Sequence, residues 1–345
     1  MLILGFYIAP YRWVPGALDH QPSPDESRQI AYQYEFKNHI NLYVQRQGMV
    51  VASFPKHLVP DGTRERKVAN LLFFDTQKWA LNFFNAFRCA MDNSLPVGSN
   101  SLRQAILDTD IYVFNSLTSG DPFDIASTQA ATLLDQARAF RDNEAIGKIE
   151  LGFGKIGDNY FMRMPLSIKQ LDDCCAFVDQ LVPDFDKNIE LFALLNEAAF
   201  LIQQGDFHRS LMSSWAVCEH LIGHEWEGYV DSTNQVLQSK QGQKTINSDR
   251  RNELLKGTKW TAYTKLEALE LAKVIPFHLF DDLRIVRGAR NKWLHTLEVI
   301  KLDAANLSLG AAHELMSRKL GVELTQRSAN YIDASAFENL RTERQ

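Results

Sequence analysis

The feature that most constrains the fold is a series of amphipathic helices beyond about Leu181. Within residues 207–226, apolar side chains recur at steps of four, four, three, four and four, as in a helix buried along one side; they are Phe207, Leu211, Trp215, Cys218, Ile222 and Trp226. Gly205 is well placed to end the preceding helix, and Asp206 to cap this one. So short a connection makes the two helices antiparallel neighbours in a helical hairpin.

Similar patterns continue to about residue 320, after a polar, Gln-rich stretch at 232–244. Pro276 suits the first turn of a helix, where its missing N–H costs nothing. The expected helices are 187–204, 207–226, 251–256, 261–273, 277–300 and 304–320. The sequence therefore predicts an all-α domain at 181–325, followed by a polar tail at 326–345.

Residues 1–180 mix strand and helix patterns instead. A chain of 345 residues exceeds the usual size of one hydrophobic core, so two domains are expected. Apolar and β-branched runs predict strands, and helical spacing predicts helices. Strands are expected at 1–9, within 33–51, and at 110–115 and 148–163; helices at 76–91 and 125–141. We expect an α+β domain at 1–180, with a regulatory, sensing or recruiting role that its sequence does not define.

Composition excludes several classes of protein. The net charge of −5 argues against a broad basic surface that coats nucleic acid, so any such contact must be local. Pro10 interrupts the apolar N-terminus before it could serve as a signal peptide or membrane span. The cysteines, at 89, 174, 175 and 218, form no CxxC pair, which argues against a zinc site or a disulfide framework. We expect a cytoplasmic protein with no membrane segment.

The expected helix at 277–300 carries an unusual arginine. Leu283, Val286, Trp293 and Leu297 form its apolar stripe, and Arg290 occupies the position between Val286 and Trp293. A charged residue in such a stripe is costly unless it is paired or the stripe opens on a cleft or an interface. A buried ion pair with Glu219 or Asp282 would explain Arg290 structurally.

Three further residues of this expected helix could act together with Arg290. Asn291 and His295 are four residues apart and share a face, and Arg287 lies four residues before Asn291. A histidine can transfer a proton, an arginine can stabilise charge on a phosphate, and an amide can orient either group. These parts suit cleavage of RNA through its 2′-hydroxyl without metal or cofactor. The ordinary alternative is that His295 is a surface histidine.

The stretches 207–222, 251–269 and 286–295 resemble successive parts of a bacterial HEPN domain, and together they cover most of residues 181–320. The pattern of that family is an Arg, usually followed by a polar residue, and a His a few residues on; Arg290, Asn291 and His295 match it. The resemblance implies an up-and-down helical bundle and a metal-independent endoribonuclease of a toxin–antitoxin, antiviral-defence or stress system. Its products would carry 2′,3′-cyclic phosphates.

The resemblance also implies a homodimer, because the active cleft of such nucleases forms where two HEPN domains pair. Arg290, Asn291 and His295 of both copies would line one groove that binds RNA, and an antitoxin or regulatory partner could restrain it. Arg287 and Glu219 are expected as supporting residues, with Glu219 positioning an arginine; a surface carboxylate is the alternative. Other HEPN domains lack nuclease activity, so a dimerising module that binds RNA or nucleotide through Arg290 is the competing interpretation.

Three weaker patterns have structural explanations. His220 and His224 with Glu225 could approach a metal, but no third ligand is evident, so no metal site is predicted. The glycines around Lys155 do not match a phosphate-binding loop and favour a β-hairpin. The basic residues at 64, 66 and 67 are expected to be a solvated loop.

Overall fold

The computed structural model describes residues 2–7, 12–14, 29–46, 48–55, 73–94, 112–114, 164–234 and 245–324. The chain divides into two compact units, Met1–Ala193 and Leu194–Gln345. The expected helix at 125–141, the strands at 148–163, the basic residues at 64, 66 and 67 and the tail at 326–345 lie outside the described residues.

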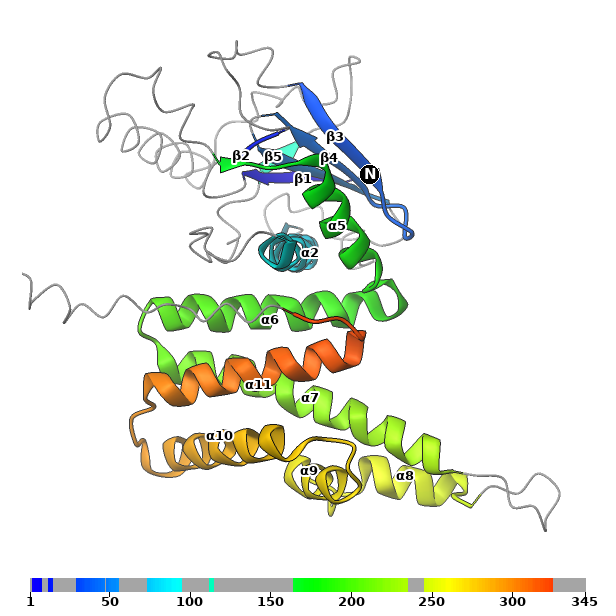
Figure 1. Cartoon of the computed structure of the whole chain (residues 1–345), viewed down its shortest axis with the longest axis vertical. Helices are drawn as coiled ribbons and strands as arrows, with labels where there is room; N and C mark the ends of the chain where they lie inside the picture. Colours follow the sequence, from blue (N-terminus) through cyan, green and yellow to red (C-terminus); the bar gives the residue numbers. More distant parts are fainter. Residues whose placement is uncertain are drawn as a thin grey trace, which may run out of the picture. The chain divides into compact units, whose positions relative to one another are not determined.

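The first unit contains an antiparallel sheet in the order β3-β4-β5-β1-β6 (Figure 1). Its strands are β1 (Leu2–Tyr7), β3 (Ile30–Glu35), β4 (Asn41–Gln45), β5 (Met49–Phe54) and β6 (Tyr112–Phe114). A separate parallel pair joins β2 (Arg12–Trp13) to β7 (Met164–Pro165). All six residues of β5 are buried, so both faces of the sheet are covered at this strand.

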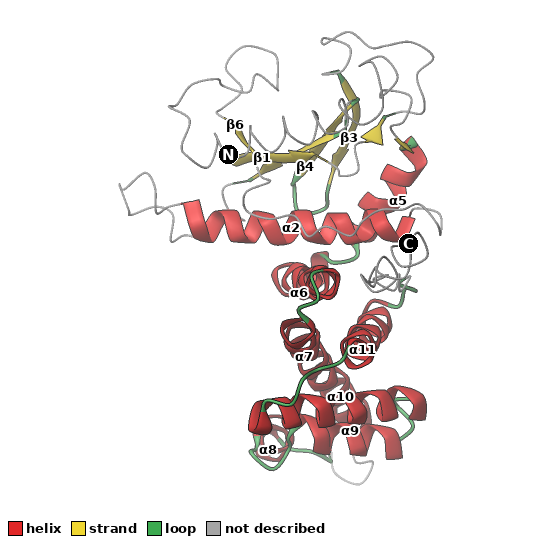
Figure 2. Ribbon diagram, turned by 90° about the vertical axis from the view of Figure 1, so that its left-hand side faces the viewer, coloured by secondary structure: helices red, strands yellow, loops and turns green. Residues whose placement is uncertain are grey.

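Helix α2 (Phe73–Ser94) runs across one face of the sheet, as Figure 2 shows. Two consecutive phenylalanines of this helix fill the interface. The ring centroid of Phe84 lies 4.9 Å from that of Phe6, and the centroid of Phe83 lies 5.4 Å from that of Phe54 and 5.7 Å from that of Phe36. Edge and tilted contacts of this kind are favourable arrangements of aromatic rings. The predicted helix at 76–91 is confirmed.

Helix α5 (Ile168–Asp179) begins with a capping box formed by Ser167 and Gln170. Two tyrosine hydroxyls of β3 donate hydrogen bonds to its carboxylates: Tyr32 to Asp172 at 2.8 Å, and Tyr34 to Asp179 at 2.7 Å. A short 3₁₀ turn (Val182–Asp184) then leads into α6 (Phe185–Gln203). These side-chain bonds fix α5 against the edge strand of the sheet.

The second unit is helical in all its described elements. They are α7 (Phe207–Thr233), α8 (Ser248–Lys256), α9 (Ala262–Leu271), α10 (Phe277–Thr296) and α11 (Leu302–Leu320). Gly205 adopts a φ of 75° between α6 and α7, and the Asp206 side chain accepts a hydrogen bond from the backbone N–H of Arg209 at 3.3 Å. Both predictions about this turn are confirmed.

Helices α7 and α11 pack closely because small residues face one another. Ser214 and Ser308 are completely buried, and their hydroxyl oxygens lie 2.6 Å apart. Ser214 also contacts the carbonyl oxygen of Ser210 at 2.9 Å. Since the hydroxyl of Ser214 has one hydrogen, which it donates to that carbonyl, Ser308 is the donor between the two helices.

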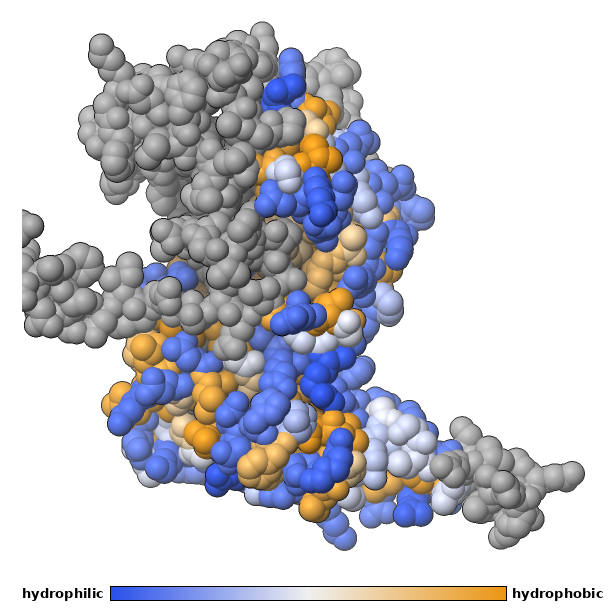
Figure 3. Space-filling model, viewed as in Figure 1, coloured by the Kyte–Doolittle hydropathy of each residue, from blue (hydrophilic) through white to orange (hydrophobic). Residues whose placement is uncertain are grey.

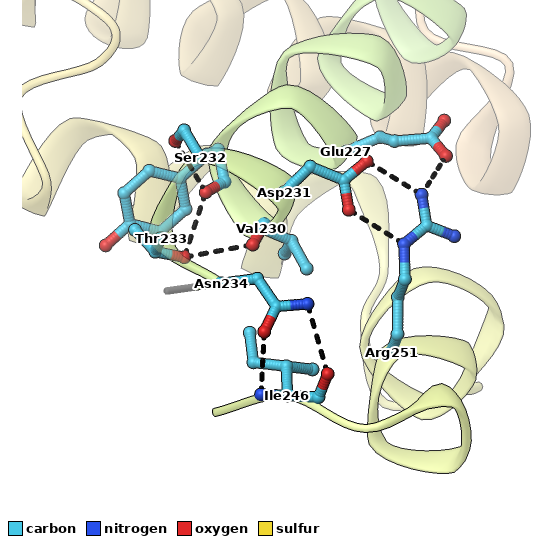
Figure 4. A network of polar contacts seen from close by, with 9 residues as sticks. Glu227, Val230, Asp231, Ser232, Thr233, Asn234, Ile246 and Arg251 are labelled. Atoms are coloured by element: carbon cyan, nitrogen blue, oxygen red, sulfur yellow. Dashed lines mark hydrogen bonds and ion pairs between the residues drawn. The ribbon is translucent and has the colours of Figure 1, made fainter. Parts of the chain in front are cut away.

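Polar contacts fasten α8 to the end of α7, as Figure 4 shows. The Arg251 guanidinium donates to both oxygens of Asp231 at 2.8 Å and to Glu227 at 2.6 Å. The Asn234 amide bonds to the backbone N–H and carbonyl of Ile246 at 2.8 and 3.0 Å, which brings positions 234 and 246 together.

Both ends of α10 differ from expectation. Pro276 is the N-cap residue of α10 rather than part of its first turn. Helix α10 ends at Thr296, because Leu297 takes the left-handed conformation with a φ of 55°. The expected helix at 277–300 was therefore too long. Among the described residues, no helix is long and apolar enough to span a membrane.

Candidate anion site on helix α10

The buried side of α10 is confined to its first half. Its buried residues are Leu279, Phe280, Leu283 and Val286, and no later residue of this fully described helix is buried. The predicted stripe beyond Val286 was wrong in part: Trp293 is partly exposed, and Leu297 is 75% exposed and lies outside the helix. Arg290 comes one turn after Val286, where the covered side ends.

Arg290 combines burial with a lack of acidic partners. Its Nε atom is buried without a hydrogen-bond acceptor, and its Nη1 donates to Oδ1 of Asn291 at 3.3 Å. In the part of the chain that the structure describes, Arg290 forms no ion pair with Glu219 or with Asp282. Neither expected ion pair accounts for the arginine.

The contact with Arg290 also fixes the orientation of Asn291. A guanidinium can only donate hydrogen bonds, so the amide oxygen of Asn291 must face it. The Nδ2 group of Asn291 is then left as a donor. Together the guanidinium and the amide nitrogen offer several N–H donors to a ligand, which suits an anion such as a phosphate.

The arginines before Arg290 have partners of different kinds. Arg284 pairs with Asp281 at 2.6 Å. The guanidinium carbon of Arg287 lies 4.1 Å from the ring centroid of Tyr263 on α9, a cation–π contact, and no ion pair joins it to an acidic residue in the described part of the chain. The sequence therefore predicted that Arg287 lies near Asn291, but it did not predict the contact of Arg287 with Tyr263.

Glu219 does not support this site. It is exposed on α7, next to the buried Cys218, and among the described residues no ion pair joins it to Arg287 or Arg290. The expected contact between Glu219 and an arginine is therefore not formed within the described residues. Residues 215, 218 and 222 face the core, and position 219 lies about 100° from position 218 around the helix.

His295 stands in the last turn of α10 and is exposed. It follows Asn291 by four residues, which places both on the same side of the helix. No hydrogen bond or ion pair holds its ring within the described part of the chain. The imidazole is thus accessible, but no contact with another described residue orients it.

A second histidine near α10 was missed by the sequence analysis. The His208 ring stacks on Trp293, with centroids 5.5 Å apart and planes at 23°. Its Nδ1 atom lies 3.2 Å from the Asp206 carboxylate. The sequence around His208 offered one indication of this arrangement, an Asp two residues before a His at the start of a helix. Its stacking partner, Trp293, lies 85 positions further along the chain, where no local pattern connects the two.

Exposed apolar side chains gather where α10 leads into α11. Leu294 is 43% exposed, Leu297 75% and Val299 82%. We call these three residues the apolar edge. Figure 3 shows hydrophobic surface along this margin of the helical unit.

The described residues contain no group of three or more His, Cys, Asp or Glu side chains placed to hold a metal. Glu225, which the sequence sets beside His224, lies 3.6 Å from the Arg318 guanidinium instead. No protein-family model, curated protein or solved structure matches this chain. The function is therefore inferred from the residues of the site.

Proposed function

We propose that this protein is a metal-independent endoribonuclease whose helical unit is a HEPN-type domain. The observation that carries the proposal is Arg290: a half-buried guanidinium with a buried, unpaired Nε and no acidic partner among the described residues, joined to an amide that offers a second donor. An arginine kept in so costly a position is explained if it binds an anion. The order Arg290, Asn291, His295 also resembles the motif of that family.

In the proposed reaction, the 2′-oxygen of a ribose attacks the adjacent phosphorus and the 5′-oxygen leaves. His295 removes the proton from the 2′-hydroxyl or supplies one to the 5′-oxygen. Arg290 stabilises the negative charge that develops on the phosphate, and Nδ2 of Asn291 holds a phosphate oxygen. The products are a 2′,3′-cyclic phosphate and a 5′-hydroxyl, and no metal takes part.

The apolar edge supports the proposal that two copies pair at this end of α10. Leu297 and Val299 are among the most exposed large hydrophobic residues in the described part of the chain, and Leu294 beside them is exposed as well. Their contact in a homodimer would remove that surface from water. It would also bring two His295 rings into one groove, so that one copy supplies the base and the other the acid. An antitoxin or other regulatory partner fits the same proposal, in a toxin, antiviral or stress setting.

One observation favours a second candidate, a non-catalytic module that binds RNA or nucleotide. His295 has no orienting partner within the described residues, whereas Arg290 and Asn291 are joined. A binding module needs the arginine as an anion clamp and does not need the histidine.

Single variants separate the two candidates. Purified protein, Arg290→Ala and His295→Ala are each compared for RNA binding and for RNA cleavage in EDTA. The nuclease predicts that His295→Ala binds RNA but cleaves at least about 100-fold more slowly, as expected for loss of a general acid or base. The binding module predicts RNA binding without cleavage in every variant except Arg290→Ala, which does not bind.

Matched controls use residues with the same chemistry elsewhere in the helical unit. Arg284→Ala removes a cation of α10 that is already paired with Asp281. His224→Ala removes an exposed histidine of α7. Equal cleavage by His295→Ala and the unmodified protein would exclude the proposed mechanism.

A further inference from the structure

His208 is held in a defined orientation by two contacts. Asp206, the N-cap residue of α7, lies 3.2 Å from Nδ1 of the ring and also 3.3 Å from the Arg209 guanidinium. The plane of the ring lies within 23° of that of Trp293. A carboxylate on one edge and an aromatic ring on one face remove most of the rotational freedom of this imidazole.

The remaining surface of His208 is open. Its side chain is 48% exposed although one face contacts Trp293 and one edge contacts Asp206. Because Trp293 contacts one face and Asp206 the Nδ1 edge, we infer that the exposed area includes the outer face and the edge that carries Nε2. The structure thus presents a flat, fixed π surface at the start of α7.

This surface lies on the same side of α10 as Arg290. Trp293 follows Arg290 by three residues, so the two side chains are neighbours on the helix surface. His295 follows Trp293 by two residues, about 200° around the axis, so its ring points away from that of Trp293. Within one copy, His208 is therefore placed to contact a group next to the anion at Arg290, and not to share a phosphate with His295.

We propose that His208, backed by Trp293, is a stacking subsite for a nucleobase of the chain whose phosphate binds at Arg290. The inference rests on the proposed anion site. A base on the outer face of His208 would extend the existing stack to three rings. Stacking of a base on an aromatic side chain strengthens binding by about 5- to 150-fold. Only an unpaired base can enter such a stack, because a base in a duplex has its faces covered.

The test compares two RNA probes with the full chain. One is a labelled single-stranded hexamer, and the other is a hexamer of the same length and charge with abasic riboses. Binding is measured in EDTA with a His295→Ala background, which keeps the probes intact. The further variants are His208→Ala, His208→Phe and Arg290→Ala, with His224→Ala as the matched control, and circular dichroism checks that each is folded.

The subsite predicts that the background protein binds the normal hexamer at least about 5-fold more tightly than the abasic one. His208→Ala should lose this preference while its affinity for the abasic probe stays the same. His208→Phe should keep the preference, because a phenyl ring also offers a flat π face. That last result separates stacking from proton transfer, which phenylalanine cannot perform.

Two outcomes overturn the proposal in distinguishable ways. If both probes require Arg290 but bind equally, or if His208→Ala retains the preference, the subsite is wrong and the anion site stands. If Arg290→Ala binds both probes as well as the background protein does, the proposed anion site is wrong. The proposed stacking subsite, which rests on that site, is then wrong too.

Discussion

Arg290 is a residue at which stability and function conflict. A buried guanidinium nitrogen without an acceptor costs free energy, whereas an apolar side chain of similar length would not. We expect Arg290→Met to raise the free energy of unfolding by about 1 kcal/mol and to abolish RNA binding. Urea denaturation and a binding titration measure the two effects.

The control for this prediction is Arg284→Met. Arg284 is exposed and paired with Asp281, so its replacement should change stability by less than about 0.5 kcal/mol and leave RNA binding intact. A marked loss of stability in Arg290→Met would instead mean that the arginine is part of the structural core.

At the scale of single residues, the sequence identified Arg290 because helical spacing alone shows which positions share a side. It did not identify the partners. Glu219 was expected beside an arginine, yet Arg287 lies over Tyr263 and Arg290 bonds to Asn291. Which of several side chains a long arginine reaches depends on how α9 and α10 pack, and no local pattern encodes that packing. His208 was missed for the same reason.

At the scale of elements, the contact between β3 and α5 depends on tyrosine hydroxyls. The hydrogen bond to Asp179, together with partial burial, raises the pKa of Tyr34 to about 12. Folded protein therefore keeps this proton at pH values where unfolded protein has begun to lose it. The stabilisation is complete below about pH 10, the ordinary tyrosine pKa, and is lost as the pH rises towards 12.

We therefore expect Tyr34→Phe to lower stability at pH 8 by about 1 kcal/mol, the usual contribution of one hydrogen bond. Between pH 8 and pH 11, the unmodified protein should lose more stability than this variant does. Urea denaturation at both pH values gives the comparison. Parallel losses in the two proteins would show that Tyr34 does not contribute to alkaline unfolding.

The contact between α7 and α11 makes a second prediction about elements. Ser308 is completely buried where the two helices meet. Ser308→Leu should overpack this contact and lower the free energy of unfolding by about 1–3 kcal/mol. Ser308→Ala, which removes only a hydroxyl, should cost about 1 kcal/mol or less, because Ser214 keeps its bond to the carbonyl of Ser210. Equal effects of the two substitutions would contradict the close packing.

The sequence predicted helices well where their apolar spacing is regular, and it predicted the ends of helices less well. Apolar periodicity located α7 and α11, since each buries one side along its length. The end of α10 was not predicted, because Leu297 adopts a left-handed conformation that usually favours Gly or Asn. The order of the strands was not predicted either. Strand β1 pairs with both β5 and β6, and this pairing depends on long-range contacts.

At the scale of the whole molecule, the apolar edge predicts self-association. Leu297→Asp with Val299→Asp should convert a homodimer into monomers, because two charges would enter an apolar interface. Sedimentation velocity at several concentrations would measure the change. Leu271→Asp is the control, since Leu271 has the same 75% exposure as Leu297 but is the last residue of α9, away from the end of α10. A monomeric unmodified protein, or equal dissociation by the control, would contradict this interface.

The strand and helix patterns of the sequence predict that the chain has two parts. They do not predict the residue at which the two compact units divide. The expected domains met at residues 180 and 181, where the strand pattern fades. The compact units divide between Ala193 and Leu194, within α6. A continuous helix carries no local mark of such a division, so sequence periodicity cannot place it.

We propose above all that the residues at the end of α10 cleave RNA without a metal. The most direct measurement incubates the protein, and its Arg290→Ala/His295→Ala double variant, with total and transfer RNA in EDTA, followed by chemical analysis of the fragment ends. We predict fragments with 2′,3′-cyclic phosphate ends from the unmodified protein alone. Identical fragments from both proteins, or cleavage that EDTA abolishes, would contradict the account.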